Sequence, residues 1–415
     1  MPSSRAWRND TEAPTWNETW NETWKDVKWN VTPHLSKFSR EREERYNLWP
    51  LWGIPLLLSC CSVVMIASLT SRNAVGGYKL ALKQFEFLLL GLSLMYVCCL
   101  TPLSLIRRVS GLFWVFAALI TVGTLIPGLG VKVGGARRWL NLGIVQFQPL
   151  EILTLAVPLF LADRLAVSTR ENFQCFCRPS ISVAMFSAIP LFGQPNMGGI
   201  ILVFAICMSM HVAAKGWKYP LVGGLFLFLG FVAMIYMEPY RIRRLLAFLD
   251  PWEDPLGKGF QIIQGLVAFS NGGILGVGVG KGLQKLNYLP AAHTDYIFPA
   301  IGEEFGLLGT LLVLSLYAYW TFKCYLLYRR SDNLYIALVV WGITVSILFP
   351  MFVNLGGVMK LMPLTGIPLP FLSSGGTALV FMWVKVGVVI RIAREMTKEM
   401  THGSTASQLG FEARR

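Results

Sequence analysis

Residues 334–355 read LYIALVVWGITVSILFPMFVNL, and this stretch decides the fold of the chain. It contains no charged side chain, and it is rich in Leu, Ile and Val. The hydrocarbon core of a bilayer takes about 20 consecutive apolar residues in a helix. The stretch is therefore predicted to be a transmembrane helix.

Nine further apolar runs have a similar length. They lie at 49–70, 86–105, 111–128, 147–165, 179–193, 197–213, 218–237, 303–326 and 375–393. Composition agrees, because 54 % of the 415 residues are hydrophobic and only 14 % are charged, against about 25 % charged in soluble domains. A soluble enzyme, a disordered chain and a disulfide scaffold are thereby excluded. We predict an all-α polytopic membrane protein with about ten transmembrane helices.

The distribution of basic residues predicts the orientation and the domains. Basic residues flank every second span, as in cytoplasmic loops: Arg107, Arg108, Arg164, Arg170, Arg178, Lys215, Lys218, Lys323, Arg329, Arg330, Arg391 and Arg394. Ten spans then place both termini in the cytoplasm. We expect a polar cytoplasmic tail at 1–48, with no cleavable signal peptide, a membrane domain at 49–395, and a cytoplasmic tail at 396–415. Residues 238–302 form the one large outer loop, between spans seven and eight.

Positive charge also gathers on the opposite face, and the net charge of the chain is +14. Lys132, Arg137 and Arg138 lie between spans three and four, and Arg243 and Lys285 lie in the large outer loop. Two interpretations stay open: long loops escape the orientation rule, or this face binds an anion. Nucleic acid is excluded as a partner, because the chain has no soluble basic domain. The eight cysteines lack metal-site spacing, so no metal centre is predicted.

Two carboxylates stand at expected membrane boundaries. Asp295 directly precedes an apolar stretch and follows His293 by two residues, and Glu151 begins the fourth run. Loss of hydration raises the pKa of a carboxyl group toward that of a working general base. The alternative is a role at the start of a helix, where acids are also favoured. Spacing alone does not decide between them. Lys385 lies inside the tenth run, where it could reach the membrane surface or pair with an acid.

The segment around Asp295 resembles the SEDS family (shape, elongation, division and sporulation) of bacterial peptidoglycan polymerases. Tyr288–Pro290, His293–Asp295 and Ile301–Gly306 carry the resemblance. Further matches follow the family's order across residues 50–395: Gly135–Trp139, Gln148–Glu151, Gln194–Gly198, Pro251–Pro255, Asn354–Gly356, Pro363–Pro370 and Ser373–Gly376. Residues 284–295 are more similar to the family's division polymerases than to its elongation polymerases.

The resemblance implies a glycosyltransferase of the bacterial cytoplasmic membrane. It implies polymerisation of lipid II on the outer face during cell division or elongation, with a class B penicillin-binding protein as transpeptidase partner among divisome or elongasome proteins. Asp295 takes the role of general base by motif match. The implied substrate-binding residues are Arg137, Arg138, Trp139, Glu151, Gln194, Arg243, Lys285, His293, Thr294, Ser373, Gly375 and Gly376. A divalent cation such as Mg²⁺ or Mn²⁺ could assist the leaving group, although no acid cluster in the outer loops demands one.

Four positions depart from the family pattern. Asn196 stands where aspartate is frequent, Thr154 where lysine is usual, Ser374 where tyrosine is usual, and Ala291 where glutamate precedes the Ala-His-Thr-Asp motif. Reduced or partner-dependent activity therefore stays open. So do a lipid II flippase, which needs no base at Asp295, and a catalytically weakened scaffold for the synthase.

Overall fold

The computed structural model describes residues 47–412, apart from 72–77, 134–135, 142, 144–145, 169–173, 175, 226–229, 231–238, 258, 284–288 and 291. The predicted N-terminal tail and Lys285 therefore lie outside the described residues. Only the backbone is described for Arg243 and for residues 398–412.

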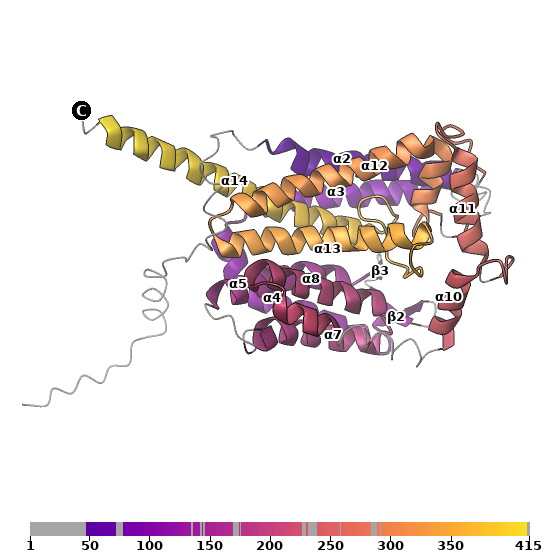
Figure 1. The fold of residues 1–415 in the computed structure, drawn as a ribbon, viewed down its shortest axis with the longest axis horizontal. Coiled ribbons are helices and arrows are strands. Elements are labelled where there is room, and N and C mark those ends of the chain that lie inside the picture. Colours follow the sequence, from indigo (N-terminus) through magenta and orange to yellow (C-terminus); the bar gives the residue numbers. More distant parts are fainter. Residues whose placement is uncertain are drawn as a thin grey trace, which may run out of the picture.

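Most of the described chain is helical, and its long helices run side by side (Figure 1). They are α2 (Trp49–Thr70), α3 (Lys79–Leu100), α4 (Leu103–Gly123), α5 (Leu150–Val167), α7 (Ser182–Gly193), α8 (Met197–Lys215), α12 (Ile297–Arg330), α13 (Leu334–Val358) and α14 (Gly376–Glu412). Within the described ranges, eight helical segments are long and apolar enough to cross a membrane: all of these except α5, with the π-helical turn η1 (Phe176–Ile181) continuing into α7. The chain is thus a multi-pass membrane protein.

The remaining two predicted runs have different outcomes. The run at 147–165 is helix α5, which has three charged side chains, Glu151, Asp163 and Arg164, within its 18 residues. The run at 218–237 lies largely outside the described residues. The predicted count of ten spans therefore stays a prediction.

One predicted span boundary was wrong because of a proline. Hydropathy extended the second span to residue 105, but α3 ends at Leu100 and α4 begins at Leu103. Pro102 disfavours the helical conformation of the residue before it, and Thr101 is indeed extended, with ψ of 128°. Helix α14 also continues through residue 395 to Glu412, past the predicted start of the C-terminal tail.

A small antiparallel sheet departs from the all-helical prediction. Its strands β1 (Gly130–Val133), β2 (Ala136–Asn141) and β3 (Gln146–Phe147) pair in the order β1-β2-β3. In the register, Val131 faces Trp139 and Leu140 faces Phe147. The Gly-Gly dipeptide between the first two strands is a hairpin signal that the hydropathy analysis did not use.

Helix α5 lies at the centre of the bundle. Thirteen of its 18 residues are buried, and it packs against α4, α8, α13 and α14. By contrast, α3 and α4 expose large apolar side chains such as Leu112 and Leu119, which are 77 % and 64 % exposed. Such surfaces are rare on soluble proteins and suit contact with lipid. A polar side chain on α5 is therefore held in the interior of the molecule.

The predicted outer loop contains two helices at one end of the bundle. Helices α10 (Pro239–Leu249) and α11 (Phe260–Gly272) stand there with strands β2 and β3, at the end opposite the C-terminus (Figure 1). Glycines at the end of α11 and after it allow close backbone approach. A Cβ at Gly272 would collide with the Gly302 carbonyl of α12, and one at Gly276 with the Glu304 carbonyl.

Candidate active site

The turn that carries Asp295 is fastened to the loop between α13 and α14. Asn354, which is 1 % exposed near the end of α13, donates from Nδ2 to the backbone oxygens of Asp295 and Ile367, both at 2.9 Å. One buried amide therefore holds both segments in a fixed relation.

A serine makes the second connection between these segments. The Ser373 hydroxyl donates to the Thr294 carbonyl at 2.6 Å and accepts from the Leu369 amide at 2.8 Å. The Ser374 amide donates to the His293 carbonyl at 2.8 Å. These bonds to the backbone just before Asp295 bring together the segments of His293 and Ser373, two predicted residues that lie 80 positions apart.

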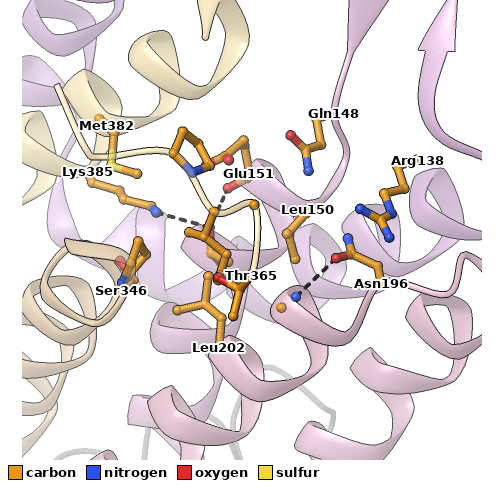
Figure 2. A pocket seen from close by; sticks show the side chains of 17 residues that line it. Arg138, Gln148, Leu150, Glu151, Asn196, Leu202, Ser346, Thr365, Met382 and Lys385 are labelled. Carbon is orange, nitrogen blue, oxygen red and sulfur yellow. Dashed lines mark hydrogen bonds between the residues drawn. The ribbon is translucent and has the colours of Figure 1, made fainter. Parts of the chain in front are cut away.

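A pocket lies between α5, α8, α13, α14 and this loop. It contains about 570 Å³ of free space, part of it open to solvent. Figure 2 shows charged and amide side chains entering from several sides, with Lys385 and Arg138 at opposite ends. The polar side chains of its lining belong to Arg138, Gln148, Glu151, Thr154, Asn196, Ser346, Thr365 and Lys385.

Asp295 lies beside this pocket. Its carboxylate approaches Gly366, a lining residue with φ of 74°, so closely that a Cβ added there would be 3.7 Å from Oδ2. The side chain of Asp295 is half-buried. Because residue 366 is a glycine, it can adopt the left-handed backbone. It also places no side chain next to the carboxylate.

A buried acid and a buried base face each other inside the pocket. Glu151 stands in the first turn of α5 and is 7 % exposed, and Lys385 of α14 is fully buried. The Lys385 Nζ donates to Thr154 Oγ1 at 3.0 Å, and the Thr154 hydroxyl donates to the Glu151 backbone carbonyl at 3.0 Å. Thr154 therefore connects the lysine of α14 to the first turn of α5, where Glu151 also has the position of a helix-start acid.

Arg138 brings a second cation to the pocket from strand β2. Its Nη2 donates to the Pro195 carbonyl at 2.8 Å, next to Asn196, whose side chain caps α8 by accepting from the Gly199 amide at 3.2 Å. Arg137 alternates to the other side of the strand and donates to the Leu125 carbonyl at 3.4 Å. Of the two predicted arginines, the structure places Arg138 in the pocket lining.

Four other predicted substrate-binding residues make structural contacts around the pocket. Gln194 is 2 % exposed and donates to the Thr121 carbonyl and to Thr124 Oγ1. Trp139 pairs within the sheet, and Gly375 and Gly376 stand at the start of α14, where a Cβ at Gly376 would collide with Phe87.

His293 adds a neutral group beside Asp295. Burial lowers the pKa of its imidazole from the ordinary value of 6.5, so the ring carries no charge at pH 7. His293 is therefore a hydrogen-bonding group rather than a third cation for an anionic substrate.

The sequence analysis did not select three residues of this site. For Lys385 the sequence leaves two interpretations, a reach to the membrane surface or a pair with an acid, and identifies no partner. Gly366 and Asn354 lie within family-like motifs, and the sequence gives them no individual role. The available signal was the charge of Lys385, since ionisable residues in transmembrane helices are functional candidates by default. In the part of the chain that the structure describes, no group of three or more His, Cys, Asp or Glu side chains could hold a metal ion.

Known proteins resemble the chain over most of its length. The family model for FtsW, RodA and SpoVE, described as cell cycle protein, matches residues 48–398. Probable peptidoglycan glycosyltransferase FtsW of Coxiella burnetii is 32 % identical over 360 residues, which cover 84 % of this chain and 96 % of the relative. Stage V sporulation protein E of Bacillus subtilis is 35 % identical over 351 residues, covering 82 % and 95 %.

Solved structures agree in fold. One belongs to work on "Structural coordination of polymerization and crosslinking by a peptidoglycan synthase complex"; it has a TM-score of 0.71 and 27 % identity, and covers 85 % of this chain and 98 % of that one. The crystal structure of RodA from Thermus thermophilus has a TM-score of 0.64 at 24 % identity, covering 85 % and 97 %.

The bundle and its charged pocket define a polytopic membrane protein with an enclosed polar site. With the family match over residues 48–398, the chain belongs to the FtsW/RodA/SpoVE family of cell cycle proteins. The predicted SEDS resemblance is thereby confirmed. The predicted closeness to FtsW is confirmed as well, because relatives named FtsW reach 32 % and 34 % identity against 24 % for RodA.

Proposed function

We propose that this protein is a peptidoglycan glycosyltransferase that polymerises lipid II, with Asp295 as the general base. The observation that carries the proposal is the fastening of the Asp295 turn beside a pocket that holds Arg138 and Lys385. Relatives named probable peptidoglycan glycosyltransferase FtsW support the activity.

The reaction needs the two kinds of group that the site offers. A sugar hydroxyl of the acceptor attacks the anomeric carbon of the donor. A new glycosidic C–O bond forms, the C–O bond to the polyprenyl pyrophosphate breaks, and the hydroxyl proton passes to Asp295. Positive charge stabilises the leaving pyrophosphate, and arginine suits this task because its planar guanidinium donates two parallel hydrogen bonds. Arg138 takes this role, with Arg243 and Lys285 as further contacts.

A divalent metal ion at this site would have to be bound by the protein and the substrate together. Mg²⁺ and Mn²⁺ sites often combine one or two carboxylates with substrate phosphates, and Glu151 and Asp295 are the acids nearest the pocket.

The setting of the reaction is the outer face of the bacterial cytoplasmic membrane during cell division. We propose ten spans, cytoplasmic termini and an outer 238–302 segment, because basic residues flank alternate spans. A class B penicillin-binding protein is the proposed partner within the division machinery, supported by the likeness to a structure from work on a peptidoglycan synthase complex.

The test is glycan-strand formation from fluorescent lipid II by the purified protein with its transpeptidase partner. Wild type is compared with Asp295→Ala and with Asp332→Ala, which removes an exposed acid from the α12–α13 connection. We expect polymer from wild type and Asp332→Ala, and none from Asp295→Ala.

Each other outcome rejects part of the proposal. Polymer from Asp295→Ala removes Asp295 from the role of base. An intact complex that forms no polymer, and in which wild type moves lipid II across vesicles, favours the flippase. An intact complex that does neither favours the scaffold.

A further inference from the structure

Among the described residues that line the pocket, Lys385 is the charged side chain whose burial costs the most free energy. It lies in the interior of α14 and is fully buried. Its Nζ donates a hydrogen bond to Thr154, 231 positions earlier in the chain, at 3.0 Å. Figure 2 shows the side chain reaching from α14 toward the part of the pocket that holds Glu151. An ammonium is expensive to remove from water, so this arrangement requires a compensating role.

Helical geometry places Thr154 and Glu151 together on one face of α5. Residues three apart lie on the same face of a helix, so Thr154 follows Glu151 by one turn on the pocket side of α5. A lysine at position 154 would direct its ammonium from that face into the pocket. In this protein, the Lys385 Nζ from α14 is already in hydrogen-bond contact with the side chain of residue 154.

The two positions therefore exclude each other. Threonine is short enough to leave room for a side chain from α14, and its hydroxyl accepts the hydrogen bond that the incoming ammonium donates. A lysine at 154 together with Lys385 would place two ammonium groups in one buried volume, which is unfavourable. The structure thus contains one cation site that either helix can supply.

We propose that Lys385 is a positioning residue that supplies, from α14, the buried positive charge of the pocket beside Glu151 and Thr154 of α5. Thr154 anchors the ammonium on the face of α5 that also carries Glu151. The activity measurement for this inference rests on the proposed function. The effect of the charge on stability is tested independently, through the unfolding temperatures.

The experiment relocates the charge. We compare lipid II polymerisation, with the transpeptidase partner and in nanodiscs, for wild type, Lys385→Met, Thr154→Lys and the double variant Thr154→Lys/Lys385→Met. Lys323→Met is the matched control, because it removes a half-buried lysine from α12 outside the pocket lining. Unfolding temperatures of all five proteins are measured in the same nanodiscs.

We expect each pocket single variant to polymerise at least about tenfold more slowly, since one factor of ten corresponds to one lost interaction of ordinary size. The double variant should recover to within about threefold of wild type, and Lys323→Met should retain the wild-type rate. A purely structural lysine would not be rescued by moving its charge to another helix. Relative to wild type, the decrease in unfolding temperature of the double variant should likewise be smaller than the sum of the decreases in the two single variants.

Three results would overturn the inference: a Lys385→Met protein as fast as wild type, a folded double variant no faster than Lys385→Met, or additive changes in unfolding temperature. If wild type forms no polymer, the proposed function fails instead. The thermal cycle then still decides whether positions 154 and 385 share one cation site.

Discussion

Replacing Asn354 by alanine should inactivate the enzyme more than it destabilises it. The Asn354 amide donates to the backbone oxygens of Asp295 and Ile367, both at 2.9 Å. The first bond holds the proposed base, and the second holds the loop that lines the pocket. Alanine removes both donors, so the Asp295 turn loses its connection to α13.

The size of the effect follows from the two bonds. Each contributes about 1 kcal/mol net, or more where a buried acceptor loses its partner. Their loss therefore costs about 2 kcal/mol, and if this appears as misplacement of Asp295 in the transition state, polymerisation slows by about thirtyfold. The binding of lipid II should change less, because Arg138 and Lys385 stay in place.

Asn333→Ala provides a matched control on the same helix. Asn333 also makes two hydrogen bonds from its side chain, accepting from the amides of Tyr335 and Ile336 at 3.0 and 3.4 Å, but it caps the opposite end of α13. Its loss should cost about 1 kcal/mol of stability without slowing polymerisation. We would measure polymerisation rates and unfolding temperatures of both variants with the partner bound. Equal rates for Asn354→Ala and Asn333→Ala would refute the reasoning.

Three further predictions concern the same turn and loop. Ser373→Ala breaks the bond to the Thr294 carbonyl, so stability should fall by about 1 kcal/mol and activity with it; an unchanged melting curve and rate would contradict this. Gly366→Ala forces a side chain into the left-handed backbone at φ of 74°, so the strained loop beside Asp295 should shift and kcat/KM should drop by about tenfold; kinetics equal to wild type would show that the loop accepts this strain without moving the base. Because burial lowers the pKa of His293 from 6.5, the folded protein binds fewer protons there than the unfolded chain. Stability should therefore be full above pH 6.5 and decline as the pH falls below it, a decline in unfolding temperature that His293→Gln should weaken.

The membrane fold could be predicted because its cause is local. An apolar run of sufficient length must form a helix in lipid, where every backbone group needs an internal partner. Residues 334–355 satisfy that condition without help from any other segment, and helix α13 covers them. The position of Asp295 before a helix was predictable for the same reason, since α12 begins at Ile297.

What the sequence could not provide was the pairing of distant side chains. Lys385 meets Thr154 across 231 positions, and Ser373 meets Thr294 across 79. Such contacts depend on which faces of the helices pack together, and hydropathy carries no information about a helix's rotation within a bundle. The sheet was missed for a related reason, because three short strands contribute little to an average over a membrane-length window.

The pattern of departures favours a working enzyme over a decayed scaffold. Asn196 lacks the carboxylate frequent in the family, but its side chain accepts from the Gly199 amide and caps α8, a task that asparagine and aspartate perform equally well. Thr154 lacks the usual ammonium, but Lys385 delivers one to its hydroxyl. A protein that only recruited a partner would be more stable with an apolar residue at 385, because replacing buried ion pairs by apolar side chains is often neutral or stabilising. The buried charge therefore points to chemistry in the pocket, and the charge-relocation experiment measures that chemistry directly.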